Sequence, residues 1–336
     1  MKDKKINYIV FGASGDLANR YLFPALENLN EVKVVSISRK DYGNLKILVD
    51  KNSEKIFHLA IPSEGVPQAV ELIRESFGKD VKILLEKPFG HNLASARELV
   101  AHVKKYFDEA QIYRVDHYLA KKSVQEIIKK DWSRDEIEKI EVVASEEIGI
   151  AGRADFYEKT GALQDFVQSH LLEIAALVLS GSFQPCSRCE ALKKLAVVCD
   201  ITKHECVKRG QYEGYRQEVG NPESMVETYV SINMVSNDPA YRGVPITLKT
   251  GKALKEKRTE VRIKYKDGHN LIFTIMPEPD AYERVISSAI AGDQGPFMSE
   301  DEVLESWRIL DSIQQTWKNS KDDLIIYKKG SSIDEI

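Results

Sequence analysis

One stretch of ten residues, Tyr113-Arg-Val-Asp-His-Tyr-Leu-Ala-Lys-Lys122, gathers side chains that could do chemistry. It supplies a carboxylate, an imidazole, a phenol and two ammonium groups: Asp116, His117, Tyr118, Lys121 and Lys122. Imidazole, phenol and ammonium groups all donate hydrogen bonds to a phosphate, and a lysine adds positive charge. The stretch therefore predicts a binding site for a phosphate group.

The position of this stretch between two expected elements gives it a structural context. It follows a β-like run, Gln111 to Val115, and precedes a helix-like run that begins near Leu119. Such a junction lies at the carboxyl edge of a sheet, where open α/β folds bind ligands. The simpler alternative is a solvated helix start with Asp116 as its N-cap. Composition leaves both interpretations open, and the rest of the chain must decide.

The chain begins with a strand, a glycine turn and a helix. Ile6 to Phe11 is a compact β-type run, Gly12-Ala-Ser-Gly-Asp-Leu-Ala18 follows, and a helix-like stretch continues to about Leu29. In such a unit Gly12 permits the tight turn, and Gly15 lets backbone N–H groups approach a pyrophosphate. The spacing lacks the three-glycine fingerprint, so an ordinary βα turn is the alternative.

The end of the second expected strand bears on the choice of coenzyme. Glu31 to Ile37 reads as that strand, and Ser38-Arg39-Lys40 follows it. An NAD enzyme usually carries an acidic residue here for the ribose hydroxyls. Arg39 can pair bidentately with a 2′-phosphate, so the pattern favours NADP, with NAD as a possible second coenzyme. A polar turn without a ligand is the alternative.

Strands and helices then alternate through the first third of the chain. Lys55 to Ala60 and Val81 to Glu86 read as strands, while Val66 to Phe77 and Ala94 to Phe107 read as helices. This order predicts a right-handed, mostly parallel sheet of the Rossmann type. The second of these strands leads into Lys87-Pro88, where the chain turns and where a cis bond is permitted.

The pattern changes after about residue 130. Glu136 to Glu146 is extended, and Gly161 to Leu179 reads as one long helix. Four more strand-like runs follow, joined by short turns: Met225 to Val235, Pro245 to Thr250, Val261 to Tyr265 and Asn270 to Ile275. The predicted fold class is α/β plus α+β, with a Rossmann-like dinucleotide-binding domain over 1–118 and a largely antiparallel α+β domain over 119–336.

Length, charge and cysteine content limit the class of protein. The 336 residues favour two domains, and a net charge of −4 gives no indication of nucleic-acid or membrane binding. We expect no signal peptide, no apolar run long enough to span a bilayer, and a cytoplasmic location. Cys186, Cys189, Cys199 and Cys206 could in principle hold zinc, but the spacing of the second pair favours reduced thiols and no metal.

Seven motifs in order along nearly the whole chain resemble the glucose-6-phosphate dehydrogenase family. They are Gly12-Ala-Ser-Gly-Asp-Leu-Ala18, Glu86-Lys-Pro-Phe-Gly90, Arg114-Val-Asp-His-Tyr-Leu-Ala-Lys121, Gln168-Ser-His170, Gly251-Lys-Ala-Leu254, Asp280-Ala-Tyr-Glu-Arg284 and Glu305-Ser-Trp-Arg308. The third motif and the histidine that follows it downstream are specific, whereas the first occurs in many folds. The resemblance thus favours the phosphate-site interpretation of the ten-residue stretch.

The resemblance implies a role for each matching residue. His170 would be the general base. Asp116 would orient His170 and stabilise its charged form, and Lys87 would contact both sugar and coenzyme. The residues implied to bind the substrate are His117, Tyr118, Lys121, Glu146, Asp165, Lys252 and Lys257. Those implied to bind the coenzyme are Gly12, Ser14, Gly15, Asp16, Leu17, Arg39 and Lys87.

The implied reaction is oxidation of a hexose 6-phosphate at C1 by NADP, in a homodimer built on the sheet of the second domain. Glucose 6-phosphate is the first candidate, and a 2-amino or otherwise modified hexose 6-phosphate is the second. The chain is short for the family, and it carries Tyr21, Ala120, Lys122 and Ser169 where a lysine, a glycine, a glutamate and an asparagine are usual. A catalytically silent sugar-phosphate or NADP-binding homologue and a glucose–fructose oxidoreductase-like enzyme are the rival interpretations.

Overall fold

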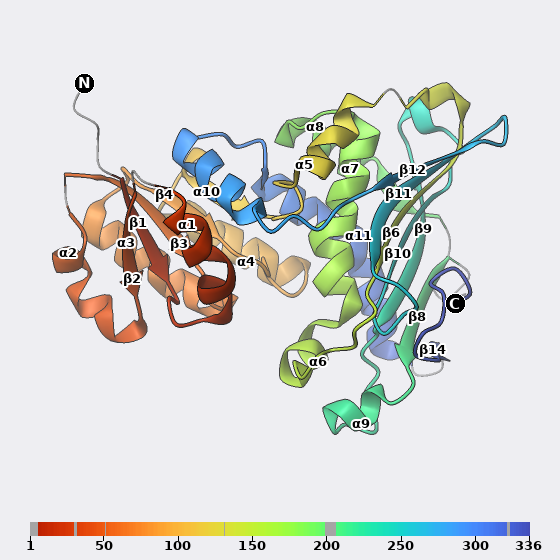
Figure 1. Ribbon diagram of the computed structural model, residues 1–336, viewed down its shortest axis with the longest axis horizontal. Coiled ribbons are helices and arrows are strands. Elements are labelled where there is room, and N and C mark those ends of the chain that lie inside the picture. The colour runs from red at the N-terminus through yellow and green to blue at the C-terminus, as the bar shows by residue number, and fades with distance from the viewer. Residues whose placement is uncertain (1–5, 30–31, 51, 131, 199–205, 321–322) are drawn as a thin grey trace. The chain divides into compact units, whose positions relative to one another are not determined.

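The computed structural model describes residues 6–29, 32–50, 52–130, 132–198, 206–320 and 323–336 (Figure 1). The chain divides into two compact units. The first comprises residues 1–122, 183–186 and 277–304, and the second comprises 123–182, 187–276 and 305–336. The expected division of the chain into domains at 1–118 and 119–336 stays a prediction.

A six-stranded sheet forms the centre of the first unit. Its order is β13-β5-β4-β3-β1-β2, in which β1 to β5 run parallel and β13 pairs antiparallel with β5. The strands are β1 (Ile6–Phe11), β2 (Val32–Ile37), β3 (Glu54–Leu59), β4 (Lys82–Leu85), β5 (Ile112–Val115) and β13 (Phe297–Met298). The predicted parallel sheet is confirmed. Because β1 lies between β2 and β3, the chain reverses direction across the sheet at the end of β1, which is a topological switch point.

β1, β3, β4 and β5 are largely buried along their length, as parallel strands are when both faces of a sheet are covered, whereas the edge strand β2 is partly exposed. The helical segments of this unit include η1 (Ala18–Leu22), α1 (Phe23–Glu27), α3 (Val66–Phe77), α4 (Leu93–Lys104) and α10 (Ala281–Ala291). Short segments are η2 (Arg39–Asn44), α2 (Leu45–Leu48), η3 (Ser63–Gly65) and η4 (Glu109–Gln111). Side chains from β1, β3, β4, β5, α10 and β13 form one buried core, which includes Val10, Ile56, Leu84, Val115, Ile286 and Phe297.

An eight-stranded sheet forms the centre of the second unit. Its order is β12-β11-β6-β10-β9-β8-β14, with β7 paired to β9. The strands are β6 (Ile137–Ser145), β7 (Leu195–Val197), β8 (Val207–Tyr212), β9 (Tyr229–Ser236), β10 (Ile246–Gly251), β11 (Arg258–Tyr265), β12 (Asn270–Thr274) and β14 (Leu324–Tyr327). Only the β10–β6 and β14–β8 pairs are parallel among the described strands of this sheet. The predicted, largely antiparallel sheet is therefore confirmed.

Three consecutive helical segments follow β6: α6 (Ala154–Ala162), η7 (Leu163–Leu171) and α7 (Leu172–Ser180). The long helix predicted over Gly161 to Leu179 is confirmed, since η7 and α7 are continuous to Ser180, but its winding is irregular and α6 precedes it across a kink. The backbone breaks at Gly161, with φ 62° and ψ 176°, and η7 is wound as a π-helix. η7 packs against β6, β9 and β10. A π-helical turn is uncommon and is frequent at functional sites.

The remaining segments of the chain are short, apart from α8 and α11. They are α5 (Lys122–Gln125), η5 (Glu126–Lys129), η6 (Arg134–Glu136), α8 (Pro185–Lys193), α9 (Tyr215–Val219), η9 (Pro239–Tyr241) and α11 (Glu300–Asn319). The second unit also has a core rich in aromatic side chains, which includes Val143, Tyr157, Tyr212, Tyr215, Tyr229 and Tyr327.

The helical run Ala154–Ser180 corrects one expectation about membranes. By length and composition it could cross a bilayer, so the expectation that no segment is long and apolar enough is wrong. However, 89% of its most apolar window is buried inside the protein, as in the core helix of a water-soluble domain.

The cysteines correct a second expectation. Cys186 is exposed, Cys189 is buried, and neither is in a disulfide. Cys206 is disulfide-bonded, so the expectation of reduced thiols is wrong at this position. That expectation depended on the redox compartment, which spacing does not report. Cys199 lies outside the described residues.

Candidate active site

The glycine turn after β1 is shaped by close backbone approaches. Gly12 has φ 78°, and a Cβ on it would lie 2.1 Å from the carbonyl oxygen of Ala60, just beyond β3. Its N–H donates to the carbonyl oxygen of Ile37, the last residue of β2, at 3.1 Å. The turn thus ties together the ends of three neighbouring strands, and only glycine fits at its start.

A helix begins at Asp16, directly after this turn, and continues to Glu27. Ser14 and Asp16 are exposed, while Gly15 and Leu17 are partly buried. The first N–H groups of a helix lack partners within it and attract anions. A turn at the switch point, followed by an accessible helix N-terminus, suits the pyrophosphate of a dinucleotide.

Arg39 opens the short helix that follows β2. Ser38 is its N-cap, and the backbone N–H and hydroxyl of Ser38 donate to Asp41 Oδ2 at 2.9 and 2.5 Å. These two bonds hold the pKa of the Asp41 carboxyl below its usual value. Arg39 itself is exposed, and across the described residues it forms no ion pair. The acidic side chain nearest in sequence is therefore engaged by Ser38, and the guanidinium suits a 2′-phosphate.

The segment after β4 carries Lys87. The Lys87–Pro88 peptide bond is cis, as the sequence permits. Gly90 has φ 83°, and a Cβ there would lie 2.6 Å from the backbone nitrogen of Ala96, so the turn requires glycine. Glu86, directly before Lys87, contacts His58 Nε2 at 2.7 Å and accepts a hydrogen bond from the Tyr282 hydroxyl at 3.3 Å.

Asp116 is fully buried at the end of β5. Its Oδ1 accepts a hydrogen bond from the N–H of Tyr118, and its carbonyl oxygen accepts one from Leu119, both at 3.0 Å. These bonds close a turn in place of a helix, and α5 starts only at Lys122. The predicted helix start near Leu119 is therefore wrong, because the aspartate side chain satisfies the backbone locally.

The structure brings together the predicted phosphate-binding side chains. The rings of His117 and Tyr118 lie 5.0 Å apart edge to face, and Lys121 Nζ lies 3.5 Å from the centroid of the Tyr118 ring. His117 also stacks on Tyr282, with ring centroids 6.0 Å apart and planes at 12°. Tyr21, where the family usually has lysine, packs its ring 5.6 Å from that of Tyr282. An imidazole, a phenol and an ammonium group thus gather on one turn.

In the second unit, Lys252 is the centre of a second cluster. Its Nζ forms an ion pair with Glu146 and another with Asp165 Oδ2 at 3.5 Å, and it lies 5.2 Å from the ring centroid of Tyr157. Lys252 is buried, whereas Glu146 and Asp165 keep 22% and 23% of their side-chain area exposed. Partly exposed carboxylates held by a buried cation are suited to accept hydrogen bonds from sugar hydroxyls.

Lys257, the fourth residue predicted to contact the sugar, lies differently. Its side chain is exposed, and its backbone N–H donates to Glu147 Oε1 at 3.3 Å. Within the described part of the chain no contact joins it to the Lys252 cluster.

His170 lies in the π-helical segment η7 and is buried. The Phe166 ring lies 5.3 Å from it, edge to face. Two residues on, the helix becomes regular again as α7. Asp116 and His170 belong to different units, so the predicted pairing of their side chains stays a prediction.

Two polar groups near these residues escaped the sequence interpretation. His58 sits on β3 with its side chain fully buried, bonded to Glu86 and to the Tyr8 hydroxyl. Glu227 is buried next to Gly161. A signal existed for His58, because a polar residue in a strand buried on both faces must find hydrogen-bond partners. No sequence signal connects Glu227 with a residue so far away in the chain.

Two family models match this chain over most of its length. The glucose-6-phosphate dehydrogenase NAD binding domain matches residues 32–126, and the C-terminal domain of the same family matches 120–278 and 273–335. The chain belongs to the glucose-6-phosphate dehydrogenase family.

Relatives in the glucose-6-phosphate dehydrogenase family cover nearly the whole chain. The protein named glucose-6-phosphate 1-dehydrogenase 6, cytoplasmic, of Arabidopsis thaliana is 29% identical over 457 residues, covering 97% of this chain and 88% of the relative. That alignment is longer than the 336 residues here, so the relative carries segments that this chain lacks.

Two solved structures share the fold. Glucose-6-phosphate 1-dehydrogenase from Mycobacterium avium has a TM-score of 0.83 and 26% identity, covering 97% of this chain and 95% of that one. A glucose-6-phosphate dehydrogenase in complex with its substrate glucose-6-phosphate has a TM-score of 0.85 at 22% identity, covering 98% and 95%. At that lower identity, the second likeness concerns the fold alone.

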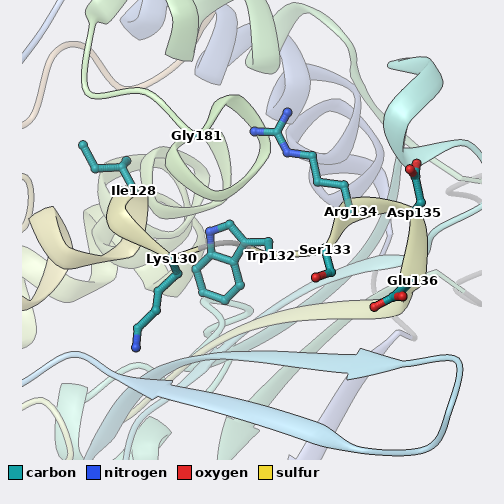
Figure 2. Close-up of a pocket in the computed structure, with 8 residues that line it drawn as sticks. All are labelled: Ile128, Lys130, Trp132, Ser133, Arg134, Asp135, Glu136 and Gly181. Carbon is teal, nitrogen blue, oxygen red and sulfur yellow. The ribbon is translucent and has the colours of Figure 1, made fainter.

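A pocket of about 550 Å³ in the second unit includes none of the predicted site residues (Figure 2). Ile128, Lys130, Trp132, Ser133, Arg134, Asp135, Glu136 and Gly181 line it. A Cβ on Gly181 would lie 2.5 Å from an Arg134 guanidinium nitrogen, so the glycine leaves room for that side chain. Basic and acidic side chains share its wall, so the pocket favours neither an anion nor a cation.

Proposed function

We propose that this protein is a glucose-6-phosphate 1-dehydrogenase that uses NADP. It would oxidise C1 of glucose 6-phosphate and release the 6-phosphogluconolactone. The observation that carries the proposal is the cluster of His117, Tyr118 and Lys121 on the turn after β5, in a chain of this family. Three donors of different type on one turn match a dianionic phosphate.

The sugar would be held at both ends. His117, Tyr118 and Lys121 would bind the 6-phosphate, and Glu146, Asp165 and Lys252 would bind ring hydroxyls. Binding energy from the phosphate would fix C1 in a reactive pose, since remote contacts can be used to orient the reacting atoms. Lys257 would contact the sugar only after its exposed side chain turns toward it.

The proton of the C1 hydroxyl would go to His170. An imidazole suits this role because its ordinary pKa of about 6.5 lies near the working pH. Asp116 would fix the tautomer of His170 and stabilise the imidazolium that forms, as in other His–Asp pairs. Both roles depend on the pairing of residues from two units and are proposals.

NADP supplies the nicotinamide that accepts the hydride from C1. The turn with Gly12, Ser14 and Gly15, followed by Asp16 and Leu17, would hold its pyrophosphate. Arg39 would bind its 2′-phosphate, and Lys87 would lie between coenzyme and sugar. NAD would bind more weakly, because it lacks the group that pairs with Arg39.

We also propose that the protein is a cytoplasmic homodimer built on the sheet of the second unit. Support for the location comes from the relatives named cytoplasmic. Light scattering at micromolar concentration measures the assembly, and a monomer would contradict the proposed dimer.

The test is a substrate panel followed by absorbance of the reduced nicotinamide. We expect the highest kcat/KM for glucose 6-phosphate with NADP, a lower value for glucosamine 6-phosphate, and a far lower one for free glucose. Equal use of free glucose would contradict the phosphate site. If the amino sugar were preferred, Tyr21→Lys should move the preference back toward glucose 6-phosphate. Tight binding of glucose 6-phosphate and NADP without turnover would identify a non-catalytic homologue.

A further inference from the structure

Four buried, titratable side chains in the first unit form a continuous row of hydrogen bonds that the proposed mechanism does not use. The Tyr8 hydroxyl lies 2.7 Å from His58 Nδ1, and His58 Nε2 lies 2.7 Å from Glu86 Oε1. The other carboxylate oxygen of Glu86 accepts a hydrogen bond from the Tyr282 hydroxyl at 3.3 Å. Tyr8 and His58 are fully buried, and Tyr282 is 7% exposed.

The direction of each hydrogen bond follows from the chemistry of the groups. An ionised Glu86 only accepts, so His58 must present Nε2–H to it. In neutral His58, Nδ1 then accepts, and the Tyr8 hydroxyl donates to it. Burial and the neighbouring Glu86 carboxylate raise the pKa of both Tyr8 and Tyr282 well above the ordinary value. Both phenols therefore keep their protons and remain donors at neutral pH.

The row connects two segments that carry predicted site residues. Glu86 follows β4 and directly precedes Lys87 in the chain. Tyr282 uses its hydroxyl on Glu86 and its ring on His117, which follows β5. A single tyrosine thus bridges the Lys87 segment and the predicted phosphate-binding turn, while His58 bonds the other carboxylate oxygen of Glu86.

We propose that Glu86 is a positioning residue, held by His58 and Tyr282, that sets the distance between Lys87 and the phosphate-binding His117. The inference rests on the proposed function, because it holds that this row of side chains positions the coenzyme contact at Lys87 relative to the phosphate contact at His117. The Glu86 carboxylate accepts two hydrogen bonds, which fix its rotamer. A fixed rotamer restrains the backbone of the adjacent Lys87.

Single substitutions separate the parts of the row. Tyr282→Phe removes one hydroxyl and keeps the ring on His117, while His58→Phe removes both ring nitrogens. We expect each to raise KM for glucose 6-phosphate and for NADP together, by roughly three- to thirtyfold. Matched controls lie in a similar group of the same unit, formed by Glu71 on α3, His102 on α4 and Tyr106 just after α4. The Tyr106 hydroxyl donates to Glu71 at 3.0 Å, and His102 lies 3.4 Å from that carboxylate.

Tyr106→Phe and His102→Phe should leave both KM values within about twofold of wild type, since among the described residues no hydrogen bond or ion pair joins that group to a predicted site residue. If Tyr282→Phe and His58→Phe lowered the thermal midpoint but left both KM values as in the controls, the row would be merely structural and the proposal wrong.

A double-mutant series tests whether Glu86 is the shared point. In a Glu86→Ala background, His58→Phe or Tyr282→Phe should change the KM values little further, because each acts through the missing carboxylate. Fully additive effects would contradict the proposal.

One readout does not depend on activity. In ¹⁵N spectra of the histidine rings, the signal that disappears in His58→Phe should show a proton on Nε2, and Tyr8→Phe should shift its Nδ1 resonance. An Nδ1–H tautomer would overturn the assigned bond directions. Failure of the proposed function would instead appear as wild-type protein that does not oxidise glucose 6-phosphate, with this spectrum unchanged.

Discussion

Glu227 closes the start of the π-helical segment that carries His170, by accepting a hydrogen bond from Leu163. The N–H of Leu163 donates to Glu227 Oε1 at 2.9 Å, and the N–H of Ala162 donates to the backbone carbonyl oxygen of Glu227 at the same distance. Glu227, which lies just before β9, thus caps a helical segment that is far from it in sequence. The carboxylate is buried, so its charge has consequences for stability.

The first prediction is a pH dependence of stability that Glu227 produces. Burial raises the pKa of its carboxyl to about 7 from an ordinary 4.5, although the Leu163 N–H partly offsets this. Between these two values the folded protein holds a proton that the unfolded chain has lost. Stability should therefore fall as pH rises from 4.5 to 7 and then level off.

Glu227→Gln keeps an acceptor for Leu163 and removes the titration. At pH near 8 it should be more stable than wild type by on the order of 2 kcal/mol, and near pH 4 the two should be similar. Urea midpoints at several pH values measure this, with the exposed Glu223→Gln as control. A wild-type advantage at pH 8 would contradict the assigned shift.

The second prediction concerns Gly161, where α6 gives way to η7. Its φ of 62° and ψ of 176° are open to glycine alone, and a Cβ would lie 2.3 Å from Glu227 Oε1. Gly161→Ala should destabilise the protein by about 2–4 kcal/mol and lower turnover, because η7 would shift. Gly152→Ala is the control, since Gly152 has φ 74° but nothing within 4 Å of its Cβ position.

The control reports the cost of a positive φ where no steric clash is present. Gly152→Ala should cost only about 1–2 kcal/mol, the cost of a left-handed backbone. Equal losses in the two variants would mean that contact with Glu227 adds nothing.

Much of the first unit could be predicted from sequence. β1 and α3 coincide with the expected runs Ile6 to Phe11 and Val66 to Phe77, because apolar residues with glycine and proline boundaries fix both type and ends. The helix expected over Gly161 to Leu179 is present, but the sequence did not predict its π-helical winding or the kink that joins it to α6. At that kink the N–H groups of Ala162 and Leu163 donate to Glu227, a distant residue that a local pattern cannot include.

The candidate site also has a part that sequence could predict and a part that it could not. Residues on one continuous segment, such as His117, Tyr118 and Lys121, could be predicted as a cluster because the chain itself holds them together. The row of Tyr8, His58 and Glu86 could not, since its members come from three different strand segments and meet only through the strand order. Periodicity shows that a strand is buried but not which strand lies beside it.

The third prediction tests coenzyme choice. Arg39→Ala should raise KM for NADP by roughly ten- to a hundredfold and leave KM for NAD nearly unchanged, since only NADP has the 2′-phosphate. Steady-state kinetics with both coenzymes measure this. Lys40→Ala, at the neighbouring exposed position, is the control and should have a smaller effect. An equal loss with both coenzymes would argue against the proposed contact.

The fourth prediction tests the phosphate contact. Lys121 is buried with its ammonium group over the Tyr118 ring, whereas the adjacent Lys122 is exposed. Lys121→Ala should weaken binding of glucose 6-phosphate by roughly ten- to a hundredfold, as expected for loss of one charge-assisted hydrogen bond. Calorimetric titration measures the affinity. If Lys122→Ala had the larger effect, the phosphate would lie on the other side of the turn.

The last prediction concerns the proposed base. His170→Asn should lower kcat by roughly 10²- to 10⁴-fold and leave the affinity for glucose 6-phosphate near that of wild type, because a base acts in the transition state. Asp116→Asn should lower kcat by a smaller factor, since the role of Asp116 is to orient the imidazole and to stabilise its charged form.

The two variants also differ in their dependence on pH. In wild type, kcat should rise with pH as the base loses its proton, and this rise should vanish in His170→Asn and shift in Asp116→Asn. Calorimetric binding of glucose 6-phosphate to both variants separates loss of chemistry from loss of folding. Near-normal turnover in His170→Asn would show that another group takes the proton.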